Sequence, residues 1–472
     1  MSKPRFHLVS LGCSKNTVDS ESMAQVLIRG GYAAAGEAAS ADVLIVNTCG
    51  FIGPAREESY FVLGQLAAAK RPGQKLIAAG CLTQRYGREV IARVPGIDGL
   101  IGTRRWMDIL QVAEGLRQGA PAARYHLPEA ETVGGEVEGV ARVARQGASA
   151  YLKIADGCRR PCAFCAIPRI KGTAVSRPPQ VLLEEARRLR DQGVREIILI
   201  AQDTTDYGHD LGLCDGLASL LEQMVRDVPE VDWIRILYAY PGAVTGRLIE
   251  VMAAHPSLIP YLDMPLQHGH PATLRRMRRP ANVEWVRRTL AQMRAVLPDL
   301  ALRTTLLVGY PGETEEEFRT LLDFAREIRF DRVGVFTFSF EPGTESESLG
   351  DPVPAEEKES RRARLMELQQ RISLERNQEQ VGRTLPVLIE GLGDGISLGR
   401  SYRDAPEIDG MVLVEGEIPA GEMVPVRVTG ALAYDLTGEV EFARDGHFES
   451  FSHQSSVVRF AQNATEVSRV RN

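Results

Sequence analysis

The sequence predicts an α/β protein with three parts: an N-terminal doubly wound parallel-sheet domain, a central partial (β/α)6 barrel and a small C-terminal all-β module. Short apolar runs alternate with amphipathic helical stretches through most of the chain, which is typical of parallel strands covered by helices. After about residue 381, short β-like runs with glycine-rich turns replace this alternation and predict the all-β module. With 472 residues, the chain is also too long for one hydrophobic core.

The N-terminal domain is expected over residues 4–119. Its strands are predicted at Phe6–Leu11, Asp42–Asn47, Lys75–Gly80 and, more weakly, Asp98–Gly102, and its helices at Thr17–Arg29, Pro54–Lys70, Thr83–Val94 and Arg105–Gln118. The following stretch, Gly119–Ala148, is rich in glycine, alanine and glutamate and has no clear periodicity. We expect it to be a linker or a loose hairpin.

The central domain is expected over residues 144–373. Six apolar runs predict its strands, at Tyr151–Gly157, Arg195–Gln202, Trp233–Tyr240, Tyr261–Gln267, Ala301–Gly309 and Arg332–Ser339. Helical stretches separate most of them, and one begins with a capping box formed by Thr314 and Glu317. Six such units favour an incomplete barrel over a closed one of eight.

The C-terminal module is expected over residues 376–446, after a charged helix at Ala355–Gln380. Its β-like runs are Thr384–Gly391, Met411–Gly416 and Met423–Gly430. Residues 381–446 contain twelve acidic and five basic side chains, a net charge of −7. The tail, residues 447–472, is polar and weakly patterned, and we expect it to be disordered.

Composition places the protein in a reducing compartment, and we expect it to be cytoplasmic. No apolar run approaches the roughly 18 residues of a membrane span, and the first residues do not resemble a signal peptide. In such a compartment the seven cysteines favour metal binding or catalysis over disulfides. The net charge of −6 weighs against broad binding to a phosphate backbone.

The strongest motif is CxxxCxxC, formed by Cys158, Cys162 and Cys165 directly after the first strand of the central domain. Three thiolates at this spacing can hold three irons of a 4Fe–4S cube and leave the fourth iron open for a ligand. A structural zinc site is the alternative, but it needs a fourth ligand, and no nearby Cys or His follows at the usual spacing.

A second cysteine set is dispersed along the N-terminal domain. Cys13, Cys49 and Cys81 each come immediately after a predicted parallel strand. Because ligands of open α/β sheets gather at the carboxyl ends of strands, the three thiols are expected to converge and hold a second cluster. Taken singly, each is better explained as a buried free cysteine, and only their shared placement favours a cluster. Cys214 has no such context, and we expect it to be a packed or surface thiol.

These features together resemble the methylthiotransferase family of radical S-adenosylmethionine (AdoMet) enzymes over roughly residues 4–446. Four strings are similar to the RimO-type branch, which modifies a ribosomal protein: GCSKNTVDSE (Gly12–Glu21), NTCGFI (Asn47–Ile52), IAQDTTDYG (Ile200–Gly208) and DAPEIDG (Asp404–Gly410). Met264 departs from the family pattern, where leucine is expected. The resemblance implies that the central domain is a radical AdoMet barrel and that the last module is a TRAM domain.

The resemblance also implies cofactors and a reaction. Cys158, Cys162 and Cys165 would hold the 4Fe–4S cluster that cleaves AdoMet, and Cys13, Cys49 and Cys81 an auxiliary 4Fe–4S cluster. The implied substrate is an aspartate of small-subunit ribosomal protein number twelve, converted to 3-methylthioaspartate with two AdoMet per turnover. Hydrogen-atom abstraction suits this carbon, since no ordinary side-chain base removes its proton readily. An electron donor and a sulfur source are required, and the substrate is either the free protein or part of an assembling ribosome.

Non-cysteine contacts to AdoMet are expected at the carboxyl ends of the barrel strands. The candidates are Phe164, between two of the thiolates, Gln267 and Arg303. Each of them could instead have a packing role, because barrel side chains often only fill the interior. No catalytic residue beyond the cluster ligands can be named.

Two other functions remain open from the sequence. A tRNA adenosine methylthiotransferase would need a basic face with stacking aromatics on the β module, whose charge of −7 disfavours direct nucleic-acid binding and favours a basic protein. A non-catalytic iron–sulfur electron carrier would usually supply four thiolates per cluster instead of three.

Overall fold

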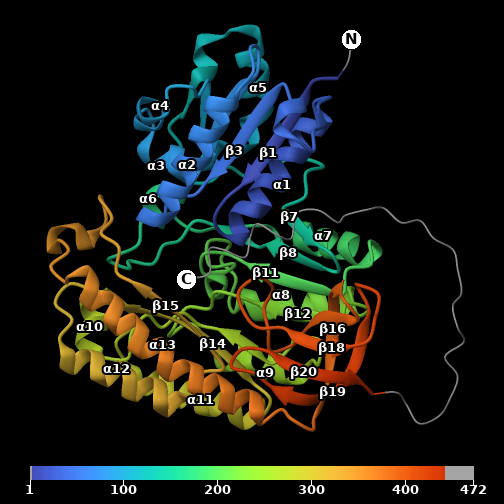
Figure 1. Cartoon of the computed structure of the whole chain (residues 1–472), viewed down its shortest axis with the longest axis vertical. Helices are drawn as coiled ribbons and strands as arrows, with labels where there is room; N and C mark the ends of the chain where they lie inside the picture. Colours follow the sequence, from blue (N-terminus) through green and yellow to red (C-terminus); the bar gives the residue numbers. More distant parts are fainter. Residues whose placement is uncertain (1–2, 442–472) are drawn as a thin grey trace, which may run out of the picture. The chain divides into compact units, whose positions relative to one another are not determined.

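The computed structural model describes residues 3–441 of the chain (Figure 1). The tail at 447–472, which the sequence predicts to be disordered, lies outside the described residues. None of the helices in the described part is both long and apolar enough to cross a membrane.

The N-terminal domain is a sheet of six parallel strands in the order β2-β1-β3-β4-β5-β6. Its strands are β1 (Arg5–Ser10), β2 (Ala33–Ala34), β3 (Val43–Thr48), β4 (Lys75–Gly80), β5 (Gly99–Gly102) and β6 (Tyr125–His126). Its helices are α1 (Ser14–Arg29), α2 (Gly53–Ala69), α3 (Cys81–Tyr86), α4 (Glu89–Arg93) and α5 (Ile109–Gln118), with 3-10 turns η1 (Ala38–Ser40), η2 (Thr103–Asp108) and η3 (Pro121–Arg124). Because successive side chains of a strand point to opposite faces, Val43 and Ile45 pack on α1 and α5, and Leu44 and Val46 pack on the other side. The predicted doubly wound sheet is confirmed.

The stretch between the first two domains is more ordered than a linker, and its end forms a hairpin, the second of the two expected alternatives. Within Gly119–Ala148, β6 adds a sixth strand to the N-terminal sheet, and β7 (Val143–Gln146) pairs antiparallel with the first strand of the central domain. These strands have two and four residues, too few for an alternating pattern to be visible in the sequence.

The central domain contains the six parallel strands that the apolar runs predict. They are β8 (Ser149–Lys153), β11 (Glu196–Ile200), β12 (Trp233–Ile236), β13 (Tyr261–Asp263), β14 (Ala301–Val308) and β15 (Arg332–Thr337). They form two sheets, β12-β11-β8-β7 and β13-β14-β15, linked by an isolated bridge between Ile234 and Leu258 and by a hydrogen bond from the N–H of Ala239 to the carbonyl of Asp263 at 2.9 Å. The barrel is therefore incomplete, as expected from six units.

Helices and short turns connect these strands and enclose one large apolar core. They are α6 (Ile167–Lys171), α7 (Pro179–Asp191), η4 (Thr204–Asp206), α8 (Gly216–Asp227), α9 (Gly246–Ala254), α10 (Pro271–Arg276), α11 (Val283–Val296), α12 (Glu315–Ile328) and η5 (Glu345–Leu349), with the small hairpin β9 (Ala155–Asp156) and β10 (Val175–Ser176). The capping box predicted at the start of α12 is present, with Thr314 and Glu317 each bonding the backbone of the other.

The C-terminal module is a closed five-stranded barrel in the order β16-β17-β18-β20-β19 (Figure 1). It follows the long helix α13 (Ala355–Gln378) and consists of β16 (Thr384–Gly393), β17 (Ile396–Ser401), β18 (Val412–Glu415), β19 (Met423–Ala431) and β20 (Leu436–Val440). Its interior residues Val387 and Val426 share one apolar cluster with Ile198 and Tyr261 of the central strands. The module therefore packs directly on the central domain.

A cavity lined by two cysteine triads

All six cysteines singled out from the sequence line one cavity of about 310 Å³. Their companions in the lining are Lys15, Asn16, Phe51, Arg160, Phe164, Ile167, Lys171, Gln202, Asp203, Tyr238, Ala239, Tyr240, Pro265, Gln267 and Arg279. The lining thus joins the carboxyl end of the N-terminal sheet to the carboxyl ends of the barrel strands. Both are the usual positions of ligand sites in α/β folds.

In the N-terminal domain each cysteine lies where a parallel strand passes into a helix. Cys13 separates β1 from α1, Cys49 follows β3, and Cys81 is the first residue of α3 after β4. The loops approach closely at Gly12, whose φ is +91°: a Cβ there would lie 2.8 Å from Cys49 Cβ and 3.2 Å from Cys49 Sγ. Only glycine therefore allows the first two loops to meet.

Asn16, in the first turn of α1, ties the three loops together. Its Nδ2 donates to the carbonyl of Leu11 at 2.7 Å and to that of Thr48 at 3.1 Å, and the Cys81 thiol donates to its Oδ1 at 3.9 Å. Sequence reasoning did not find this residue. An asparagine in a helical stretch gives no sign that its amide reaches loops from two other strands.

The three thiols have unequal acidities. Burial raises the pKa of Cys49 to about 11 and that of Cys81 to about 12. Burial also raises the pKa of Cys13, but the charge of Lys15, the N–H of Asn16 and the charge of Lys171 outweigh it and lower this pKa overall. Cys13 caps the N-terminus of α1, a position that favours a thiolate.

The second triad is held in the loop between β9 and α6. The N–H of Cys158 donates to the carbonyl of Gly172 at 3.0 Å, and that of Cys165 to the carbonyl of Cys162 at 3.1 Å. Burial raises the pKa of Cys158 to about 11 and of Cys165 to about 12. Arg279 donates to Cys162 Sγ at 3.5 Å, which adds a positive charge beside the loop.

The donor sets fit clusters better than single ions. Among residues 3–441, no three Cys, His, Asp or Glu side chains lie close enough to hold one metal ion. A 4Fe–4S cube instead gives each thiolate its own iron, so that its ligands stand further apart than those of a zinc ion. Thiols with pKa values of about 11 to 12 also need a metal to release their protons near neutral pH.

The three candidate AdoMet contacts differ in position. Phe164 and Gln267 line the cavity, and Gln267 has a left-handed backbone with φ of +75°. Arg303 is absent from the lining, and its guanidinium instead donates to Asp263 at 2.9 Å and to Asp409 of the C-terminal module at 3.3 Å. Cys214 is exposed and also absent from the lining.

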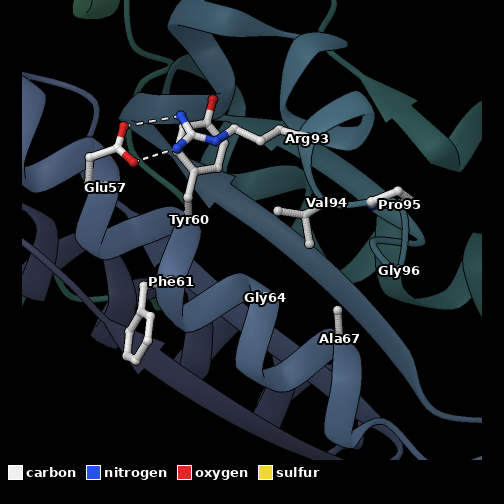
Figure 2. A pocket seen from close by; sticks show the side chains of 9 residues that line it. All are labelled: Glu57, Tyr60, Phe61, Gly64, Ala67, Arg93, Val94, Pro95 and Gly96. Atoms are coloured by element: carbon white, nitrogen blue, oxygen red, sulfur yellow. Dashed lines mark hydrogen bonds and ion pairs between the residues drawn. The ribbon is translucent and has the colours of Figure 1, made fainter.

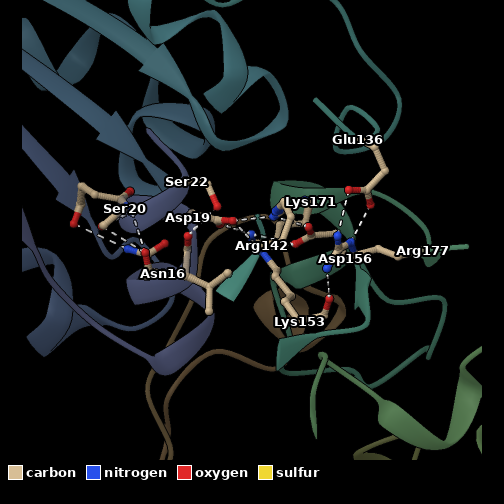
Figure 3. Close-up of polar contacts among 12 residues, drawn as sticks. Asn16, Asp19, Ser20, Ser22, Glu136, Arg142, Lys153, Asp156, Lys171 and Arg177 are labelled. Carbon is tan, nitrogen blue, oxygen red and sulfur yellow. Dashed lines mark hydrogen bonds and ion pairs between the residues drawn. The ribbon is translucent and has the colours of Figure 1, made fainter. Parts of the chain in front are cut away.

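A buried cluster of charges that the sequence analysis did not find lies beside the cavity (Figure 3). Asp19 of α1 accepts from Arg142 at 2.6 Å, from Lys153 at 2.5 Å and from Lys171 at 2.9 Å, while Asp156 pairs with the same three cations. Burial raises the pKa values of both carboxyl groups, but the cations outweigh it and hold them below their usual range. These ion pairs join α1 to the central domain, so that the two domains that carry the triads are held together beside the cavity.

A second hollow, between α2 and the end of α4, carries no candidate chemistry (Figure 2). Its charged groups, Glu57 and Arg93, pair with each other and are more than half exposed, and the side chain of Phe61 faces solvent.

An incomplete six-stranded barrel with a three-cysteine loop near its first strand defines the class of radical AdoMet enzymes, and comparisons with known proteins agree. The profile of the Radical SAM superfamily matches residues 152–325, that of Uncharacterized protein family UPF0004 matches residues 5–102, and that of the TRAM domain matches residues 381–440.

Relatives identify the family. The chain is 51% identical over 454 residues to the ribosomal protein uS12 methylthiotransferase RimO of Chloroflexus aurantiacus, covering 92% of this chain and 99% of that protein. It is 48% identical over 458 residues to the RimO protein of Roseiflexus sp., covering 92% and 97%. The chain belongs to the RimO family of methylthiotransferases. Among solved structures, the radical S-adenosylmethionine methyltransferase TsrM from Kitasatospora setae matches with a TM-score of 0.55 at 13% identity, covering 84% and 81%, a likeness of fold alone.

Proposed function

We propose that the chain converts an aspartate of ribosomal protein uS12 to 3-methylthioaspartate. The observation that carries this proposal is the convergence of two three-cysteine sets on one cavity, in a chain whose relatives are named uS12 methylthiotransferases. The reaction replaces a hydrogen on the aspartate β-carbon by a methylthio group. It therefore needs a group that removes a hydrogen atom and a group that delivers sulfur, both within reach of one carbon.

The cofactors are two 4Fe–4S clusters and AdoMet. Cys158, Cys162 and Cys165 would hold the first cluster and, as a set, Cys13, Cys49 and Cys81 the second. When bound, these groups supply hydrogen abstraction, sulfur and, from a second AdoMet, the methyl group. Each triad lacks a fourth cysteine, which leaves one iron of each cluster open to a ligand from the cavity.

Side chains of the barrel wall would hold AdoMet. Phe164 stands between Cys162 and Cys165 and lines the cavity, where its backbone and ring can contact adenine. Gln267 offers an amide at the carboxyl end of β13, fixed by its N–H bond to the carbonyl of Thr305 at 2.8 Å. Arg303 donates a hydrogen bond to Asp263 and does not line the cavity. A direct contact between Arg303 and AdoMet stays a prediction.

The negative charge of the C-terminal module indicates which partners the enzyme would bind. The acidic C-terminal module attracts a basic ribosomal protein, free or within an assembling ribosome, and repels phosphates, so that we expect no direct binding of nucleic acid. An electron donor must reduce the first cluster, and a sulfur source must reload the second. Because the proposed substrate is a ribosomal protein, we expect the enzyme to act in the cytoplasm.

The test compares substrates under anaerobic reduction. The reconstituted enzyme, AdoMet and sulfide are incubated with purified uS12 or with bulk tRNA, and mass spectrometry follows the mass of CH3S replacing H, roughly 46 Da. A gain on an aspartate of uS12 supports the proposal. A gain confined to a tRNA nucleoside would make the chain a tRNA methylthiotransferase, and an enzyme that never releases 5′-deoxyadenosine would be an electron carrier.

Variants of each triad separate the two roles. Replacing Cys158, Cys162 and Cys165 together by alanine is expected to abolish release of 5′-deoxyadenosine. The same change at Cys13, Cys49 and Cys81 is expected to preserve that release but to end sulfur insertion. The exposed Cys214→Ser variant controls for the loss of a thiol and should behave as the wild type.

A further inference from the structure

Lys15 is a buried cation without a carboxylate partner. Its side chain points into the cavity from the first turn of α1, only 8% of the residue is exposed, and no carboxylate in residues 3–441 pairs with it. The ammonium lies 3.2 Å from the centre of the Tyr238 ring. A cation–π contact offsets only part of the cost of removing an ammonium from water, so that this cation is suited to receive an anion.

The other cations of the lining already have partners. Lys171 is held by Asp19 and Asp156 in the cluster of Figure 3. Arg160 pairs with Asp203 at 2.6 Å. Arg279 donates to the carbonyl of Pro265 and to the thiol of Cys162. Lys15 is thus the lining cation whose ammonium has neither a carboxylate partner nor a hydrogen bond among residues 3–441.

The aromatic residue that contacts Lys15, Tyr238, has a strained backbone. Tyr238, just beyond β12, has φ of +65°, a conformation that costs free energy for a non-glycine residue. Its N–H donates to Asp263 Oδ2 at 3.1 Å, and its carbonyl accepts from the N–H of Thr204 at 3.1 Å. The structure holds this ring in a strained position where it fixes one ammonium, which is typical of a functional site.

We propose that Lys15 binds the side-chain carboxylate of the substrate aspartate, an inference that rests on the proposed function. The reacting β-carbon is bonded directly to the carboxylate carbon, so that gripping the carboxylate also places this carbon. Lys15 lies two residues after Cys13, on the wall of the triad that would deliver sulfur. This contact therefore sets the carbon beside the sulfur, in the same cavity that Cys158, Cys162 and Cys165 line. It also selects aspartate over asparagine, whose amide oxygen can accept a hydrogen bond from the ammonium but carries no charge to balance it.

Binding measured without turnover tests the inference. Full-length enzyme with both clusters oxidised and AdoMet bound is titrated with a labelled uS12 peptide carrying the aspartate, and with the same peptide carrying asparagine. For Lys15→Met we expect the Kd of the aspartate peptide to rise about 10- to 100-fold, the range for a lost charge-assisted hydrogen bond. The Kd of the asparagine peptide should rise much less, because an uncharged amide oxygen gains less from the ammonium than a carboxylate does.

Two further variants and two further measurements guard the interpretation. Lys15→Arg retains the charge and should keep the preference for aspartate, whereas Lys75→Met removes a lysine at the far end of β4 and should change neither Kd. Iron content and the Kd of AdoMet are measured for every variant. Equal weakening of both peptides, or no weakening, overturns the inference, and a raised Kd of AdoMet alone assigns Lys15 to the AdoMet carboxylate instead. A wild-type enzyme that binds the peptide but never modifies aspartate refutes the proposed function, not the carboxylate grip.

Discussion

Replacing Glu196 with glutamine tests how the C-terminal module is fixed to the central domain. The Glu196 carboxylate, at the start of β11, accepts from Arg235 Nε at 2.7 Å and from Arg400 Nη2 at 2.6 Å. Arg235 in turn donates to the carbonyl of Tyr402 at 2.9 Å. All three charged side chains are at most 2% exposed. Neutralising Glu196 therefore leaves the guanidinium groups of Arg235 and Arg400 buried at the interface without the carboxylate charge that both of them contact.

The magnitude follows from two independent arguments. Burial raises the pKa of Glu196, but Arg400 and Arg235 outweigh it and lower this pKa from 4.5 to about 2. At about 1.4 kcal/mol per pH unit, a shift of this size corresponds to about 3 kcal/mol of stability. Removing one partner of a buried ion pair costs about 3–5 kcal/mol in other proteins. Both arguments predict that Glu196→Gln loses about 3 kcal/mol at neutral pH.

The pH dependence has a definite sign. Because the folded-state pKa lies below the unfolded value, the stabilisation is complete above about pH 4.5 and is lost as the pH falls towards about 2. Urea denaturation of the metal-free chain, followed by circular dichroism, should show a large difference between variant and wild type at pH 7 and a smaller one at pH 3. Equal stabilities at pH 7, or a difference that grows in acid, would refute the reasoning.

Glu390→Gln is the matched control for this measurement. Glu390 also accepts from Arg400, at 2.7 Å, but its side chain is 37% exposed. Water screens such a pair, and its loss should cost less than about 1 kcal/mol. A loss as large as that of Glu196→Gln would mean that burial does not set the strength of these contacts.

Three further predictions concern the cavity. Asn16→Leu removes the amide that ties the cysteine loops and should lower reconstituted iron from about eight to about four per chain, with release of 5′-deoxyadenosine retained; a full iron complement would contradict the role of Asn16. Gly12→Ala forces a methyl group against Cys49 and should lower the iron content in the same way, and an unchanged iron content would show that the cluster does not need this close approach. Asp19→Asn removes one of the two carboxylates that pair with Arg142, Lys153 and Lys171. The free energy of unfolding in urea should fall by about 3–5 kcal/mol, whereas a fall below about 1 kcal/mol would show that Asp156 alone balances the three cations.

The sequence predicts the cysteine sites because they follow from local patterns. Strands of the N-terminal sheet are short apolar runs, and a parallel sheet brings all their carboxyl ends to one edge. Cys13, Cys49 and Cys81 could therefore be placed together without knowing any contact between them. The CxxxCxxC loop is local in the same sense, since its three thiols lie within eight consecutive residues.

The partners of charged residues could not be predicted in this way. Arg303 lies on a predicted barrel strand, and its place near the carboxyl end suggests a ligand contact. Its partner Asp409 is 106 residues further along the chain, in another domain, where no periodicity reveals it. The same holds for Asp19 and Lys153, which are separated by 134 residues. The role of a buried charged residue depends on its ion-pair partner, and local sequence patterns do not reveal a partner that is distant in the chain.

The charge of the C-terminal module, in contrast, keeps its meaning in the folded protein. Two of its acids, Asp404 and Asp409, turn inward to Arg332 and Arg303, and two of its bases, Arg400 and Arg403, turn inward to Glu196 and Asp331. Two acidic and two basic side chains of the module are thus buried, so that burial does not change the net charge of its surface. The excess of acidic side chains is exposed, on residues such as Glu407, Glu415, Glu417 and Glu422. A surface of this sign accelerates the approach of a basic protein and slows that of a polyanion. We therefore expect the module to favour a ribosomal protein over tRNA, and the proposed contact with Lys15 would then select the aspartate.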